Sequence, residues 1–231
     1  MTWFVIALIA PILWSFVNHA DKLILSKYVK GQELGSLMIY SCLFAVLLAP
    51  IAYFMQPEIF VISTLHITIL ILAGILEALA VYLYLIALND EETSVVVPFF
   101  QSIPIFAFIL GYFVLGEMVT IKYILASLVT IIGGALLSFE ITTGNKIVFK
   151  KKMVLAILAS SFIFALHRTL FKLASVTEDF WISIFWQSIG LILVGLFLLF
   201  VVRKYREQFM ALLRENGAPI FFLNVISLPS I

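Results

Sequence analysis

The stretch from Ser94 to Glu117 reads SVVVPFFQSIPIFAFILGYFVLGE and decides the fold class of this sequence. It can cross a bilayer, because about 20 mainly apolar residues suffice for a transmembrane helix and no charge precedes its last residue. Pro98 and Pro104 interrupt it, with Gln101 between them. Backbone groups that a proline leaves unpaired need a partner inside the protein, so we expect this span to be buried among other helices. Transporters place substrates at such interrupted spans, and a kinked packing helix is the alternative interpretation.

The composition is that of a polytopic membrane protein. Of the 231 residues, 64% are hydrophobic and 12% are charged, whereas about 25% of the residues in soluble domains are charged. We therefore expect an integral, multi-pass protein of the cell membrane that is surrounded by the lipid bilayer. The net charge of +1 gives no electrostatic reason to expect nucleic acid as a partner.

Apolar runs predict an all-α bundle with about seven complete membrane spans and part of an eighth. The predicted spans are residues 3–22, 34–54, 65–88, 94–116, 121–139, 153–172 and 180–202. Residues 203–216 are polar and basic, and we expect them to form a loop. The last apolar run, from Ala218 to Ile231, is too short to cross the hydrocarbon core, which needs about 20 residues.

Polar side chains within the spans are the candidate cavity residues. Glu77 lies near the middle of its span, where a carboxylate costs at least about 2.5 kcal/mol. Tyr84 follows two helical turns later on the same face. We interpret Glu77 as a cavity-facing group or a proton carrier, and a protonated Glu77 that is hydrogen-bonded within the bundle is the alternative. Trp186 and Gln187 occupy the first half of the last complete span.

The first span carries a polar stripe along one face. Pro11, Trp14, Asn18, Asp21 and Lys22 recur there at steps that place them on the same side of a helix. Polar groups at membrane depth turn towards protein or a water-filled cavity, so we expect the stripe to face a cavity. The alternative is that these side chains lie at the membrane surface and extend to the headgroups.

Two weak similarities indicate an internal repeat. Lys22 aligns with Lys172, and the run SLMIYSCLFAVLL from Ser36 resembles SIFWQSIGLILVGL from Ser183. The basic run at residues 146–152 falls where a second unit would begin. Because the first unit would contain an odd number of spans, a second copy would enter the membrane from the opposite side and have inverted topology.

A set of short motifs between residues 87 and 138 is the most specific feature of the sequence. It consists of a polar turn after Ala87 and Leu88, the residues Ser94, Val95 and Val96, a proline at Pro104, the triplet Leu115, Gly116 and Glu117, and the pair Gly133 and Gly134. This pattern resembles the EamA domain of the drug/metabolite transporter superfamily, and Trp14 and Lys22 in the first span also fit. The resemblance covers nearly the whole chain, although only residues 87–138 are specific. It implies ten spans in two repeats around a central substrate cavity, and a secondary transporter (permease) of amino acids, other metabolites or drugs that works by alternating access.

The resemblance also implies a division of the chain. Residues 1–140 would form the first five-helix repeat, residues 141–152 a basic linker and residues 153–231 a partial second repeat. The expected ninth and tenth spans do not occur in the sequence. We therefore expect a truncated chain, and the alternative is that a second chain or a dimer completes the bundle. A non-transporting membrane scaffold and an inactive fragment are the alternative functions.

Several residues are candidates for contact with the solute. The candidate cavity residues are Trp14, Asn18, Glu77, Tyr84, Gln101, Trp186 and Gln187, and Pro98 and Pro104 are candidate hinges. Aromatic walls suit small amphipathic solutes or cations, the amide side chains would hydrogen-bond the solute, and Glu77 would carry charge and the coupling proton.

We expect no enzyme, metal or cofactor. A zinc protease needs two histidines one helical turn apart, whereas His19, His66 and His167 are scattered singly. The sequence also contains no glycine-rich phosphate loop. Which solute is carried, in which direction and with which ion stays open.

Two signals disagree on the orientation in the membrane. Lysines and arginines are concentrated after the first, fifth and seventh spans, and the positive-inside rule then places the N-terminus outside the cell. The family resemblance implies a cytoplasmic N-terminus. The charge pattern slightly favours the outside.

Overall fold

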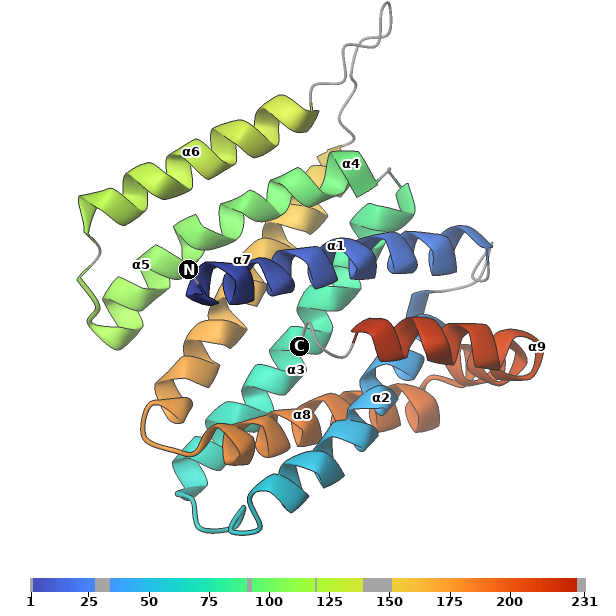
Figure 1. Ribbon diagram of the computed structural model, residues 1–231. Coiled ribbons are helices and arrows are strands. Elements are labelled where there is room, and N and C mark those ends of the chain that lie inside the picture. Colours follow the sequence, from blue (N-terminus) through green and yellow to red (C-terminus); the bar gives the residue numbers. More distant parts are fainter. Residues whose placement is uncertain (1, 28–33, 91–92, 119, 139–150, 228–231) are drawn as a thin grey trace, which may run out of the picture.

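The computed structural model describes residues 2–27, 34–90, 93–118, 120–138 and 151–227, and every regular element in this part of the chain is a helix. The elements are α1 (Thr2–Lys27), α2 (Leu34–Met55), α3 (Thr64–Asp90), α4 (Thr93–Val96), the 3₁₀ helix η1 (Val97–Ser102), α5 (Ile103–Leu115), α6 (Ile121–Ser138), α7 (Lys151–Ser175), α8 (Phe180–Val201) and α9 (Arg203–Ser227). The helices form one bundle, which Figure 1 shows with α6 at its outer edge. The prediction of an all-α fold is confirmed.

The bundle contains helices that can cross a membrane. Five candidate spans occur among the described residues, and they are Leu34–Met55, Thr64–Asn89, Val97–Leu115, Lys151–Ser175 and Phe180–Val201. Such a set makes the chain an integral, multi-pass membrane protein, as the composition predicts. The count of about seven spans and the inverted second repeat stay predictions.

The central helix is α3, which packs along both α7 and α8. It crosses α8 closely because a glycine from each helix lies at the contact. A Cβ atom on Gly74 would lie 2.1 Å from the carbonyl oxygen of Gln187, and one on Gly190 would lie 2.2 Å from that of Ile71. Small residues let helix backbones approach one another in a membrane. The same crossing brings Glu77 of α3 beside Gln187 of α8.

The proline-interrupted stretch folds as α4, η1 and α5 in succession. Pro98 and Pro104 lie at the starts of η1 and α5, where the missing N–H group of proline costs least. At the other end, Gly116 adopts a left-handed conformation with φ 67°. The N–H group of Glu117 then donates to the carbonyl of Gly111 at 3.1 Å, and α5 ends at a left-handed glycine, as many helices do. The predicted interruption is therefore observed as two places in the same membrane span where a new helix begins, at η1 and at α5.

The burial expected for this stretch is only partly observed. Phe100 and Gly111 are buried, but Phe113 is 78% exposed and Tyr112 is 55% exposed. The expectation that the whole span is buried was wrong, because prolines in first turns leave few carbonyls without a partner and do not require a protein environment all round. One face of α5 is therefore free to contact lipid.

The polar segment after α8 also differs from the prediction. Residues 203–216 are not a loop but the first part of α9. Phe209 and Leu212 are buried against α2, and the hydroxyl of Tyr40 in α2 donates to the carbonyl of Gly217 at 2.8 Å. The few apolar residues of this segment fall on one helical face. The prediction of a loop was wrong because it rested on the overall polarity of the segment and not on the spacing of these apolar residues.

The predicted linker at residues 141–152 lies mostly outside the described residues. Its last two residues, Lys151 and Lys152, belong to the first turn of α7. The division into repeats at 1–140 and 153–231 stays a prediction.

Candidate functional site

A cavity of about 160 Å³ lies between α1, α3, α7 and α8. Such a space has room for several water molecules. The residues that line it are Trp14, Glu77, Phe164, His167, Arg168, Phe171, Phe180, Ile184 and Gln187. The structure therefore brings Trp14, Glu77 and Gln187 together from among the predicted cavity residues.

The polar centre of the cavity is the pair of Glu77 and Gln187. Nε2 of Gln187 donates to Oε2 of Glu77 at 2.5 Å, and the two side chains are 5% and 7% exposed. Arg168 of α7 adds an attractive electrostatic interaction with Glu77. An ionisable group at membrane depth needs such partners. Because the bond joins α3 to α8, any movement between these helices would change the surroundings of the carboxylate.

An aromatic cluster of Trp14, Tyr84, Phe100 and Phe164 borders the cavity through Trp14 and Phe164. The ring of Phe100 has its centroid 6.2 Å from that of Trp14, 5.2 Å from that of Tyr84 and 5.7 Å from that of Phe164. Ring pairs at such distances contribute about 0.5–1.5 kcal/mol each beyond the area that they bury. The cluster ties α1, α3, η1 and α7 together.

Asn18 and Tyr84 bind one another outside the cavity lining. The hydroxyl of Tyr84 donates to Oδ1 of Asn18 at 2.9 Å, and this hydrogen bond is buried. Nζ of Lys22 similarly donates to the carbonyl of Leu88 at 2.9 Å. The polar stripe of the first span is thus divided: Trp14 faces the cavity, and the residues that follow hold α1 against α3.

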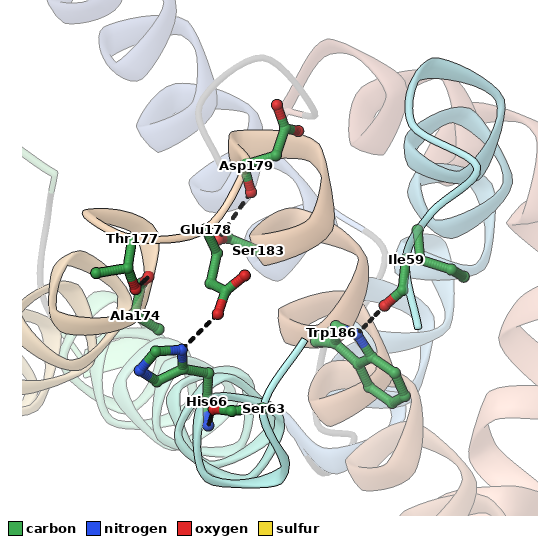
Figure 2. Close-up of polar contacts among 9 residues, drawn as sticks. All are labelled: Ile59, Ser63, His66, Ala174, Thr177, Glu178, Asp179, Ser183 and Trp186. Carbon is green, nitrogen blue, oxygen red and sulfur yellow. Dashed lines mark hydrogen bonds and ion pairs between the residues drawn. The ribbon is translucent and has the colours of Figure 1, made fainter. Parts of the chain in front are cut away.

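Gln101 and Trp186 also lie outside the cavity lining. Gln101 is half-buried in η1. Nε1 of Trp186 donates to the carbonyl of Ile59 at 2.9 Å, and Figure 2 shows the indole turned towards the segment between α2 and α3. In this conformation Trp186 holds the segment between α2 and α3 against α8.

Polar contacts hold the helix ends around the turn between α7 and α8 (Figure 2). Nδ1 of His66 lies 2.6 Å from Oε1 of Glu178, which joins the first turn of α3 to the turn between α7 and α8. The carboxylate of Asp179 accepts a hydrogen bond from the N–H group of Trp181 at 2.8 Å and so caps α8. The cavity extends towards this end, since Phe180 in the first turn of α8 belongs to its lining.

His167 and Arg168 are lining residues that the sequence analysis did not identify. The guanidinium carbon of Arg168 lies 5.4 Å from the ring centroid of Trp14, within the range of a cation–π interaction. A signal was present, because Phe164, Arg168 and Phe171 recur at steps of four and three residues and so share one helical face. The two basic residues lie near the end of the predicted span at residues 153–172, and α7 continues to Ser175.

The chain matches one known family. The sequence model of the EamA-like transporter family matches residues 1–139, the part that contributes Trp14 and Glu77 to the cavity. No curated protein and no solved structure matches the chain. Within the described residues, no three or more His, Cys, Asp and Glu side chains are placed to hold a metal ion.

Proposed function

The chain belongs to the EamA-like transporter family, whose members are membrane transporters, and we propose that it is a secondary transporter that moves a small solute by alternating access. The observation that carries this proposal is the buried pair of Glu77 and Gln187 on a cavity inside the bundle. Transporters bind their substrates near the bilayer midplane, and ionisable groups at that depth mark pathways for solutes or protons.

The lining gives each part of a small solute a different surface. Trp14 and Phe164 offer aromatic walls, Gln187 offers an amide, and Glu77 offers a carboxylate. Small metabolites, amino acids and drugs of low mass are the solute classes that this proposal includes. Glu77 would also carry the coupling proton, since movement of α8 would replace the Gln187 amide by another environment and change how readily the carboxylate binds a proton.

Alternating access requires one side of the cavity to close while the other opens. In this proposal the aromatic cluster closes the side towards the end of α3. The contact of His66 with Glu178 lies at the opposite end of the bundle. We propose that the cluster separates in the second state. Pro98 and Pro104, at the starts of η1 and α5, would act as hinges that let Phe100 move with η1.

Cysteine labelling tests whether the cavity contains water. In a Cys42→Ala background, Ile184→Cys places a thiol on the cavity lining, and Ser160→Cys places one at a position that is fully buried between α7 and α3. We expect a small water-soluble thiol reagent to modify Ile184→Cys in membranes and to leave Ser160→Cys unmodified. Protection of both positions would favour the non-transporting scaffold, because a static bundle needs no aqueous cavity.

A further inference from the structure

One side of the cavity contains a polar atom that the bundle does not satisfy. Nδ1 of His167 is buried and has no hydrogen-bond partner in the part of the chain that the structure describes, and the side chain is 7% exposed. Leaving such a group unpaired is costly. His167 lines the cavity, and a rotation of its ring would bring the buried Nδ1 within reach of a bound molecule.

The next residue presents a cation to the same space. The guanidinium carbon of Arg168 lies 5.4 Å from the ring centroid of Trp14. The ring attracts the positive charge through its π face. This contact does not use the N–H groups of the guanidinium as hydrogen-bond donors, so they stay available for a bound molecule. Among the described residues, Glu77 is the carboxylate that interacts electrostatically with Arg168. The hydrogen bond to Gln187 already holds Glu77 from the other side.

We infer that His167 and Arg168 form a subsite for the carboxylate group of the solute, an inference that rests on the proposed transport function. A guanidinium binds a carboxylate through two parallel N–H···O bonds, and a proton on Nδ1 of His167 lets the ring donate to the same group. Gln187 and Glu77 are left to bind the other end of the solute. A cavity of about 160 Å³ suits a small solute.

The inferred subsite sets a condition on charge. Arg168 is the cation and Glu77 the acidic group of the cavity lining. A solute carboxylate adds one negative charge, so the occupied cavity needs either a positive group on the solute beside Glu77 or a proton on Glu77. The solute is therefore an amino acid-like zwitterion or a monocarboxylate that enters with a proton.

Four probes of nearly equal size separate these possibilities: alanine, propionate, alaninamide and propionamide. The readout is the rate at which a water-soluble maleimide modifies Ile184→Cys, with Phe180→Cys as a second reporter on the cavity lining. Modification without any probe tests the water-filled cavity of the proposed function, and protection by a probe tests the subsite. We expect protection by alanine, propionate or both, and none by the two amides.

Variants identify the residues responsible. Arg168→Gln should weaken protection by the carboxylate probes at least about tenfold, since hydrogen bonds to a charged group contribute about 1.5–3 kcal/mol. His167→Phe keeps an aromatic ring beside Phe164 but lacks Nδ1, and should weaken protection to a smaller extent. Arg206→Gln in α9, away from the cavity, should change nothing.

Several outcomes would overturn the subsite while leaving the transporter proposal intact. Equal protection by the amides and the carboxylates would do so, as would protection that Arg168→Gln does not alter, or the absence of protection by all four probes at an accessible cysteine. Protection by alanine alone selects the zwitterion, and protection by propionate that strengthens at low pH selects the monocarboxylate with its proton.

Discussion

Glu77 is the residue at which burial and charge conflict most directly. Its carboxylate lies inside a membrane span with 7% exposure, and Gln187 and Arg168 compensate it from two other helices. Such an arrangement lets a carboxylate exchange a proton when the helices move, because each conformation offers it different partners. An amide at position 77 could still accept the hydrogen bond from Gln187, but it could not bind and release a proton.

We therefore expect Glu77→Gln to abolish uptake that is driven by a pH gradient while it preserves exchange of solute between the two sides. Proteoliposomes loaded with labelled alanine or propionate measure both processes. Glu58→Gln, in the exposed segment after α2, is the matched control and should keep both. Gradient-driven uptake by Glu77→Gln at the normal rate would remove Glu77 from the coupling mechanism.

The sequence identified some residues of the site and missed others for a physical reason. Glu77 stood out because a mid-span carboxylate is costly wherever it lies, and Trp14 and Gln187 were among the predicted cavity residues. Arg168 and His167 were missed because basic residues near a span end are ordinary at a membrane surface. Only the long-range packing of α7 against α1 and α3 makes them part of a cavity.

At the scale of helices, the contact between α3 and α8 depends on the absence of side chains at two positions. Gly190→Ala would place a methyl group 2.2 Å from the carbonyl oxygen of Ile71, so the two backbones would have to separate. We expect destabilisation of about 1–3 kcal/mol, as for other overpacked contacts, visible as a lower unfolding temperature in detergent and slower solute exchange. The cause would be the altered position of Gln187 relative to Glu77.

Gly133→Ala provides the control for that prediction. A Cβ atom on Gly133 of α6 would meet nothing within 4 Å, and alanine is about 0.5–1 kcal/mol better than glycine inside a helix. Its unfolding temperature should stay the same or rise. Equal losses in both variants would mean that glycine flexibility, and not the close crossing, determines the stability of the bundle.

The aromatic cluster leads to a second prediction about elements. Phe100 contacts rings from three other segments, and Phe→Ala in a packed site removes about 3–5 kcal/mol. Phe100→Ala should therefore favour the state in which η1 has moved away, and a cysteine at Ile184 should react faster with a thiol reagent added on the side where α8 ends. Phe113→Ala, at a ring that is 78% exposed, should leave the rate unchanged. Unchanged labelling in Phe100→Ala would show that the cluster does not close the cavity.

The residues at which helices begin and end were easier to predict from the sequence than the neighbours against which each helix packs. The bounds of α2, α3 and α8 follow from continuous apolar runs, which have few alternatives in a membrane. The exposed face of α5 and the packing of α9 on α2 did not follow, because each depends on which neighbours cover a face. Overall polarity gave the wrong structure for residues 203–216, whereas the spacing of Phe209 and Leu212 would have indicated a helix.

For the whole molecule, the distribution of charge gives the bundle two unlike ends. Basic residues occupy the last turn of α1, the first turn of α7 and the first turn of α9, which include Lys27, Lys151 and Arg203. At the opposite end Lys172 is paired with Glu117 at 2.5 Å, and Lys122 lies in the first turn of α6. The cavity extends towards this less basic end through Phe180.

The positive-inside rule then predicts that the basic end is cytoplasmic and that the cavity extends towards the outside. Two cysteines in a Cys42→Ala background measure this: Lys152→Cys in the first turn of α7, and Val176→Cys, 72% exposed in the turn before α8. In intact cells, a membrane-impermeant maleimide should label Val176→Cys at once and Lys152→Cys only after permeabilisation. The opposite pattern would place the N-terminus in the cytoplasm, as the family resemblance implies. The cavity would then extend towards the cytoplasm, and solute export would start from the conformation described here.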